Sequence, residues 1–502
     1  MKSISVSRHT LAEIQPHIPL ELPRPDSFDL PEKILQFGTG VLLRGLPDYY
    51  IDQANKRGIF NGRIVMVKST TQGDTRAFDA QDSMYTLCVR GLENGRKVEH
   101  YFLNNAVSRV LTAQANWDQI LQLATRPEMQ VVISNTTEIG IQLVADDVFA
   151  SPPHSFPGKL LAFLYARYQA FNGDVNKGMV IIPTELVTDN GDKLSSILSE
   201  LSQANSLPEP FQHWLEHCNT FCNSLVDRIV PGKLPEDESQ MLEDKLGYRD
   251  ELLISAEPYS LWAIETPKET TKELLGFAAA GAAPGILLSP DISKHRELKL
   301  RLLNGTHTFS CALAYLSGCD TVGKAMETPA VSTFIEALMK HEITPAISGE
   351  VISPEEALAF TARILDRFRN PFIIHKWLSI AVQYTSKMRM RNIPLLQAHY
   401  RKFQTPPSFM AKGFAAYLLF MRSEKKKDGT FQGTYGGNRF TIQDEYAELL
   451  YQGWRMHPDN PAETLLSDTR LWGTDLTKLP GFLETTEAQL KAWMKHPIAS
   501  TP

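Results

Sequence analysis

The sequence predicts an α/β protein: a Rossmann-like, doubly wound N-terminal domain followed by a mostly α-helical C-terminal domain. Short apolar strands, beginning with residues 33–37, alternate with helical stretches over the first 290 residues. The first strand runs directly into Gly38-Thr39-Gly40, and a strand that ends in such a turn opens a helix in dinucleotide-binding folds. After Pro290 the strand signal nearly disappears, so we place the two domains at residues 1–290 and 291–502.

Composition indicates an ordinary globular protein. The 502 residues are 43% hydrophobic and 22% charged, and the formal net charge of −6 argues against a nucleic-acid partner. Five cysteines without a CxxC pair favour a reducing compartment. The N-terminus has no apolar core of signal-peptide length, and the apolar run at residues 274–288 is short and broken by Pro284. We therefore expect a cytoplasmic protein without a membrane partner, either a monomer or a small homo-oligomer.

The glycine turn is the predicted cofactor site. Residues 1–31 contain five prolines and are expected to form an extended arm that leads to it. Backbone N–H groups at the start of a helix bind a pyrophosphate, and glycines let it approach. A tight turn without a ligand is the alternative, because Leu43 occupies the position of the third glycine. The expected cofactor contacts are Leu35, Gln36, Phe37, Gly38, Thr39, Gly40, Val41, Leu42, Leu43, Arg44, Gly45 and Leu46.

Two further strands bear on the cofactor. The strand at residues 63–68 has no acid after it until Asp74, so its sequence leaves both NAD and NADP open. The strand at residues 129–134 ends in a polar cluster, and the carboxyl ends of parallel strands are where doubly wound sheets hold ligands. We expect Asn135, Thr136 and Glu138 to contact the cofactor.

The stretch KLRLLNGTH places Lys299, Asn304 and His307 within nine residues. In an α-helix His307 lies about 80° and Asn304 about 140° around from Lys299, so all three can border one cavity. A desolvated lysine can exchange a proton with a hydroxyl, and an asparagine N–H can stabilise the alkoxide. A solvated helix lysine beside a local break is the alternative.

A second group of candidates contains cations. Residues 385–391 alternate basic with other residues, and in an extended backbone Lys387, Arg389 and Arg391 point to one side. Such a set suits the carboxylate of a sugar acid, although a solvated basic rim explains the spacing equally well. The pair His213 and His217 has no convincing partners for a metal, and we predict none.

The pattern K-x4-N-x2-H resembles the signature of the polyol-specific long-chain dehydrogenases, the mannitol dehydrogenase family. Further similar segments extend from about residue 33 to the C-terminus: G-x-G followed by Arg44, QDSMYT at residues 81–86, SNTTE at 134–138, Asn190-Gly191-Asp192, and VDRI at 226–229. The segment RFRNPFIIH at 367–375 resembles one branch of the family, which acts on altronate and tagaturonate.

This resemblance implies a role for each candidate. Lys299 would be the acid/base of an NAD-dependent oxidoreductase, Asn304 and Asn190 would stabilise the alkoxide, and His307 would orient lysine or substrate. Asp227 would lie in the substrate site, although a buried pair with Arg228 that braces two elements is the structural alternative. The sugar-acid substrate would be bound by Lys387, Arg391, Arg389 and His375. We expect this site in a cleft between the two domains.

Two alternatives compete with the altronate and tagaturonate reaction. The same residues suit fructuronate (mannonate) or a neutral polyol. A cofactor-binding sensor without turnover is the non-enzymatic alternative, which the joint presence of Lys299, Asn304 and His307 disfavours.

Overall fold

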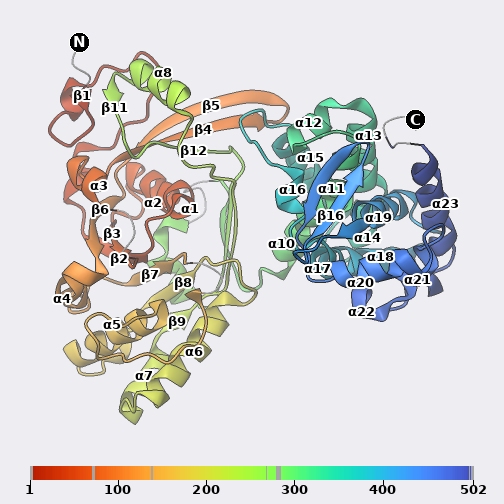
Figure 1. Ribbon diagram of the computed structural model, residues 1–502. Helices are drawn as coiled ribbons and strands as arrows, with labels where there is room; N and C mark the ends of the chain where they lie inside the picture. Colours follow the sequence, from red (N-terminus) through yellow and green to blue (C-terminus); the bar gives the residue numbers. More distant parts are fainter. Residues whose placement is uncertain are drawn as a thin grey trace. The chain divides into compact units, whose positions relative to one another are not determined.

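The computed structural model describes residues 4–70, 74–136, 140–266, 268–278, 284–496 and 498. The chain divides into two compact units (Figure 1). Unit 1 consists of Met1–Arg90 and Lys97–Ile292, and unit 2 consists of Gly91–Arg96 and Ser293–Pro502. Among the described residues, no helix is both long and apolar enough to cross a bilayer.

Unit 1 is built on a six-stranded parallel sheet of order β6-β3-β2-β7-β8-β9. The first of these strands along the chain lies in the middle, and the order reverses between β2 and β7. This is the strand order of dinucleotide-binding folds, so the predicted Rossmann-like fold is confirmed. The strands are β2 (Glu32–Phe37), β3 (Arg63–Lys68), β6 (Val107–Thr112), β7 (Val131–Ser134), β8 (Val180–Pro183) and β9 (Thr220–Phe221).

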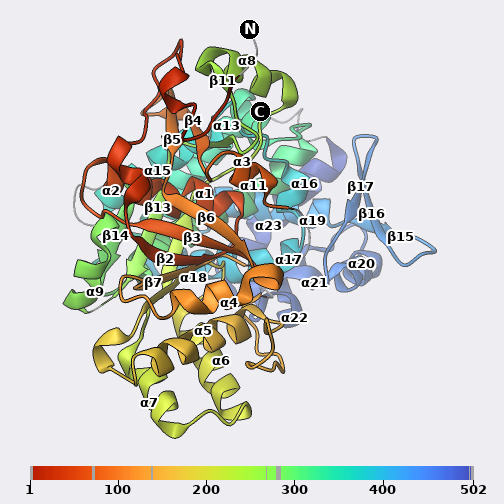
Figure 2. The same cartoon turned by 90° about the vertical axis from the view of Figure 1, so that its left-hand side faces the viewer.

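Successive residues of a strand point to opposite faces of the sheet, and here both sets are apolar. Helices therefore cover both faces. Leu35 and Phe37 pack towards one face, and Ile34 packs towards the other. Figure 2 shows the two helical layers on opposite sides of the strands. One layer contains α4 (Ala113–Leu123), α5 (Phe156–Ala170), α6 (Asn190–Ala204) and α7 (Glu209–Cys218), and the other contains α1 (Val41–Gly45) and α2 (Pro47–Lys56).

Smaller sheets complete unit 1. The N-terminal arm packs against the rest of unit 1. Strand β1 pairs with β11, and Val6, Ile14 and Phe28 are buried in a small hydrophobic cluster. One three-stranded sheet has the order β12-β4-β5 and another β10-β13-β14. These elements are β1 (Ile4–Ser5), α3 (Arg76–Ala80), β4 (Tyr85–Glu93), β5 (Arg96–Asn104), β10 (Ser224–Asp227), α8 (Glu236–Leu246), β11 (Tyr248–Arg249), β12 (Ile254–Ala256), β13 (Leu261–Glu265), α9 (Glu269–Leu274) and β14 (Ile286–Ser289).

Unit 2 is mostly helical, as predicted. Helices α11 and α19 are largely buried and pack against each other, and α19 also packs against α23. Three π-helical segments, η6, η7 and η8, interrupt its α-helices. The elements are α10 (Ser293–Leu298), η6 (Lys299–Gly305), α11 (Thr306–Leu316), α12 (Val322–Glu327), α13 (Pro329–Ala337), η7 (Leu338–Ile343), α14 (Thr344–Ile347), α15 (Pro354–Phe368), α16 (Trp377–Ile380), α17 (Tyr384–Lys387), η8 (Met388–Asn392), α18 (Ile393–Lys402), α19 (Ser408–Phe420), α20 (Ala447–Met456), α21 (Ala462–Ser467), α22 (Thr469–Trp472) and α23 (Phe482–Lys495).

One stretch of unit 2 differs from its prediction. From their charged and glycine-rich sequence, residues 424–438 are expected to form a flexible surface loop, but they belong to an antiparallel sheet of β15 (Ser423–Lys425), β16 (Phe431–Tyr435) and β17 (Asn438–Ile442). Phe440 of β17 is buried, and its ring stacks on that of Phe420 at 4.5 Å. This aromatic contact with α19 stabilises the small sheet. Because the sequence of residues 424–438 is rich in charged residues and glycine, its apolar contact was not apparent.

Candidate active site

The predicted acid/base lysine lies at the start of a π-helical segment. Helix α10, segment η6 and helix α11 follow one another without a break, and η6 begins at Lys299. A π-helix bonds residue i to residue i+5, so residues five apart lie one turn from each other. The α-helical angle predicted between Lys299 and Asn304 is therefore wrong: the wider turn brings Asn304 onto the side of Lys299. Both side chains are half-buried.

His307 lies one residue into α11 and is enclosed by aromatic rings. Its ring centroid is 4.2 Å from that of Phe368, 5.1 Å from that of His375 and 5.8 Å from that of Trp377. Burial, followed by the positive charges nearby, lowers the pKa of His307 well below its usual value, so its imidazole is neutral. The buried Nδ1 has no hydrogen-bond partner among the described residues. This nitrogen is thus available to an amine or a hydroxyl brought next to it.

Several positive groups of unit 2 gather around His307. Besides burial, His375, Arg367 and Arg391 each lower the pKa of His307. Burial lowers the pKa of His375, and Arg367 and Lys387 lower it further. The pKa of Lys387 is lowered by burial and then by Arg391. Such groups disfavour one another's protonated forms, and a bound anion relieves this repulsion. We call Arg367, Lys387 and Arg391 the cation cluster, beside which the imidazole of His375 is neutral.

The cation cluster arises from helices and not from an extended strand. Residues 384–392 form α17 and η8, so the predicted one-sided alternation is wrong. Lys387 donates to the carbonyl of Ile380 at 2.8 Å, and Arg391 donates to Thr308 Oγ1 at 3.2 Å. Arg389 is exposed and lies beside Gly473. Helical winding therefore separates Arg389 from its two neighbours, while Lys387 and Arg391 are four residues apart.

In unit 1, the glycine turn lies at the switch point of the sheet. Gly38 follows β2 with φ of +125°, and an added Cβ would lie 2.9 Å from the carbonyl oxygen of Asn135, so only glycine fits without strain. Gly40 has ordinary dihedral angles, and an added Cβ would meet no atom within 4 Å. The turn therefore leaves open space over the first N–H groups of α1, which suits a pyrophosphate.

The residues after this turn point into the protein. Arg44 is buried, donates to the carbonyl of Leu252 at 2.7 Å and lies over the rings of Phe78 and Tyr85. The helix breaks at Leu46, between Gly45 and Pro47, two residues that disfavour a continuous helix. Arg44 thus holds the turn in place, and its guanidinium is committed to the core.

The polar cluster after β7 is held by a buried carboxylate that the sequence did not single out. Glu185 accepts from Thr136 N at 2.9 Å and from Ser134 Oγ at 3.1 Å, and burial raises its pKa. Asn135 donates to the carbonyl of Thr184 at 3.0 Å. Glu138 lies outside the described residues.

Asn190 is wholly buried where β8, α6 and β10 meet. Its amide nitrogen lies 3.0–3.2 Å from the carbonyl oxygens of Pro183, Glu185 and Ser224, and its oxygen accepts from Ser224 N. Two amide hydrogens thus have three acceptors, so a bond to substrate would replace one of these. Asp227 ends β10 and is also buried.

Comparison with known proteins identifies the family. Residues 32–275 match the mannitol dehydrogenase Rossmann domain, and residues 291–494 match the mannitol dehydrogenase C-terminal domain. This chain belongs to the mannitol dehydrogenase family. Among its relatives, the altronate oxidoreductase of Halalkalibacterium halodurans is 39% identical and covers 90% of this chain and 88% of its own. That of Bacillus subtilis is 38% identical and covers 90% of each chain.

Solved structures of this family share the fold. Mannitol 2-dehydrogenase of Pseudomonas fluorescens, in a ternary complex with NAD and D-mannitol, has a TM-score of 0.69 at 20% identity and covers 99% of this chain and 98% of its own. A D-sorbitol dehydrogenase in substrate-free form has a TM-score of 0.73 at 20% identity, covering 98% and 99%. The family prediction is confirmed, and the chain is an oxidoreductase with a nicotinamide cofactor.

Within this mannitol dehydrogenase fold, sequence reasoning missed two groups. Arg367 belongs to the quoted segment RFRNPFIIH but was not singled out, although it acts on both His307 and His375. Glu185 follows β8, yet nothing in the sequence spacing shows that it connects two strand ends. Only the contacts in the folded chain distinguish these residues from ordinary surface charges.

Proposed function

We propose that this mannitol dehydrogenase family member interconverts altronate and tagaturonate. Three relatives named altronate oxidoreductase are 36–39% identical and cover at least 90% of the chain. The structural observation that carries the proposal is the cation cluster of unit 2. A neutral polyol needs no such cluster, whereas the carboxylate of a sugar acid binds it through charge-assisted hydrogen bonds.

Each proposed group has a defined task in oxidation. Lys299 Nζ accepts the hydroxyl proton of altronate and returns it when tagaturonate is reduced. The amide N–H of Asn304 stabilises the alkoxide, and Asn190 would supply a second donor by exchanging one of its main-chain acceptors. Neutral His307 uses Nδ1 to orient the lysine or a substrate hydroxyl. Asp227 is the proposed contact to a further hydroxyl.

Within the cation cluster, we assign the substrate carboxylate to Lys387 and Arg391. Lys387 and Arg391 are half-buried next to each other, so their charges are less screened than that of exposed Arg389. His375 and Arg367 complete the site from the segment that precedes α16. Arg389 is left as an outer charge that attracts the substrate without contacting it.

The cofactor is proposed to be NAD. Its pyrophosphate would lie over Gly40 at the N-terminus of α1, and its nicotinamide end near Asn135 and Thr136. When bound, the nicotinamide exchanges hydride with the substrate carbon. The mannitol 2-dehydrogenase with the same fold is a complex with NAD, which supports this choice over NADP.

A spectrophotometric panel tests the proposal. NADH and NADPH oxidation are followed with tagaturonate, fructuronate and tagatose, the ketose with a hydroxymethyl group in place of the tagaturonate carboxylate. We expect the highest kcat/KM with tagaturonate and NADH. A preference for tagatose would refute the role of the cation cluster, and a preference for fructuronate would reassign the substrate.

A further inference from the structure

The two π-helical segments that carry the proposed reactive groups pack against each other. Segment η6 carries Lys299 and Asn304, and segment η8 carries Arg391. A π-helix is a strained winding that persists where neighbouring groups support it. The structure shows two sets of hydrogen bonds between these segments, and both involve arginine.

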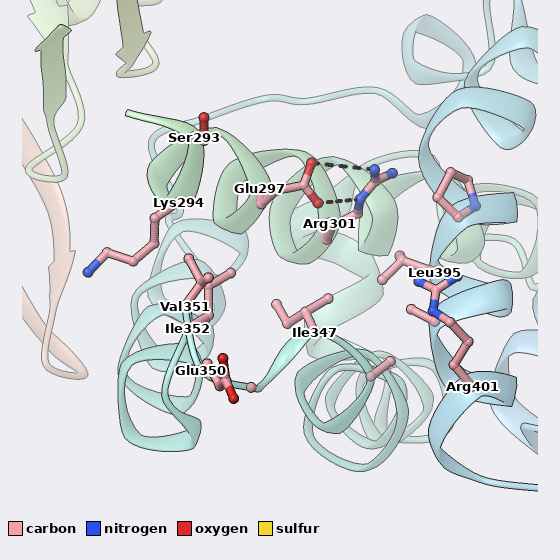
Figure 3. Close-up of a pocket in the computed structure, with 14 residues that line it drawn as sticks. Ser293, Lys294, Glu297, Arg301, Ile347, Glu350, Val351, Ile352, Leu395 and Arg401 are labelled. Carbon is pink, nitrogen blue, oxygen red and sulfur yellow. Dashed lines mark hydrogen bonds and ion pairs between the residues drawn. The ribbon is translucent and has the colours of Figure 1, made fainter. Parts of the chain in front are cut away.

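The first set is made by Arg301 of η6. Its Nη1 donates to the carbonyls of Met390 and Arg391 in η8, at 3.1 and 2.9 Å. Its other edge binds Glu297 one turn earlier, with Nε to Oε2 at 2.9 Å and Nη2 to Oε1 at 3.4 Å, as the dashed lines in Figure 3 show. The Arg301 side chain is 13% exposed, so the paired carboxylate orients a largely buried guanidinium.

The second set runs in the opposite direction. Arg391 Nη1 donates to Thr308 Oγ1 at 3.2 Å, and the Thr308 hydroxyl donates to the carbonyl of Asn304 at 2.7 Å. Thr308 is fully buried. Each segment thus uses its arginine to hold the other: Arg301 binds the backbone of η8, and Arg391 reaches the backbone of η6 through one hydroxyl.

We propose that Arg301 and Thr308 are positioning residues that hold the acid/base segment at a set distance from the carboxylate-binding segment, and that they thereby favour sugar acids over neutral sugars. The inference rests on the proposed function. A substrate bound by its carboxylate at Arg391 reaches Lys299 only if this distance matches its chain. A neutral sugar does not use Arg391 and depends less on the distance.

Arg301 also lines an open cavity of about 410 Å³ in unit 2. Figure 3 shows Arg301 above the apolar side chains of Ile347 and Leu395, with exposed Arg401 across the opening. In an Arg301→Ala variant, a guanidinium ion can enter through this cavity and restore the lost hydrogen bonds. Arg401→Ala removes an arginine from the same cavity without touching η8, which makes it the matched control.

The experiment compares kcat/KM for tagaturonate and tagatose in matched variants whose thermal unfolding is recorded in parallel. Thr308→Val removes the hydroxyl at nearly constant volume, and Thr308→Ser retains it. A displacement of about 1 Å lowers turnover by roughly a hundredfold, so we expect Thr308→Val and Arg301→Ala to lower the acid-to-neutral ratio by about tenfold or more. Thr308→Ser and Arg401→Ala should stay near the parent ratio. Guanidinium at low, non-denaturing concentration should restore Arg301→Ala towards the parent ratio.

Equal losses for both substrates, or an unchanged ratio in Thr308→Val and Arg301→Ala, would overturn the inference. Arg391→Gln separates it from the proposed function. If Arg391→Gln abolishes the preference for the acid and Thr308→Val does not, the carboxylate site stands and the positioning role fails. If Arg391→Gln leaves the preference intact, the carboxylate site itself is wrong, and the inference falls with it.

Discussion

Replacing Gly40 by alanine tests the cofactor site without disturbing the fold. Gly40 has φ of −65° and ψ of 159°, which any residue adopts, and an added Cβ meets nothing within 4 Å. Alanine at a compatible glycine position stabilises a protein by about 0.4–1 kcal/mol. The free energy of unfolding should therefore stay unchanged or rise slightly.

Cofactor binding should suffer in the same variant. The new methyl group occupies the space through which a pyrophosphate approaches the N-terminus of α1. Losing one hydrogen bond to a charged group costs about 1.5–3 kcal/mol. We therefore expect the Kd for NADH, measured by fluorescence titration, to rise about 10- to 100-fold.

Two other glycines serve as controls. Gly323→Ala is the same change at another open position, in α12 of unit 2, and should raise the free energy of unfolding slightly in the same way while leaving NADH binding unchanged. Gly38→Ala should instead destabilise the protein by about 1–3 kcal/mol, because its φ of +125° is strained for alanine. An unchanged Kd for NADH in Gly40→Ala would refute the placement of the pyrophosphate.

Three further predictions concern the acid/base group, a buried carboxyl and the small sheet. Lys299→Met should lower kcat by about 10²- to 10⁴-fold and leave the Kd for NADH unchanged; near-parental kcat would exclude Lys299 as the acid/base. Burial raises the pKa of Asp48 from 3.8 to about 8, so ionisation opposes folding increasingly as pH rises from 4 to 8. Asp48→Asn should therefore stabilise the protein in urea unfolding at pH 7, by at most about 4 kcal/mol, and hardly at pH 4; equal effects at both would contradict this. Phe440→Ala should destabilise unit 2 by about 3–5 kcal/mol because its ring packs between Phe420 and Tyr315, and a loss below 1 kcal/mol would show a loose sheet.

The Rossmann-like fold was predictable because its signals are local. Each central strand is a short apolar run, and the Gly38 turn follows the first of them directly. The spacing of apolar residues and the turn residues that bound them indicate a strand wherever it lies in a protein, because they reflect which faces of the strand are buried. The motif from Lys299 to His307 was equally visible, since its residues are close together in the chain.

The conformation of the segments that carry the proposed reactive groups was not predictable. Lys387, Arg389 and Arg391 alternate as they would in a strand, yet they lie on α17 and η8. The choice of a π-helical turn depends on distant partners, such as the guanidinium of Arg301 on the carbonyls of η8. No pattern within nine residues contains that information.

Local sequence thus established the parallel sheet and the glycine turn and singled out the side chains proposed to react, because backbone preference and hydrophobic period act over a few neighbouring residues. The tertiary structure decided which charges meet. It brought Arg367 and Arg391 to His307 and Lys387 to His375, turned Arg44 into the core and left Arg389 exposed. Electrostatic energy depends on distance through space and on burial, and both arise only when separate segments pack together.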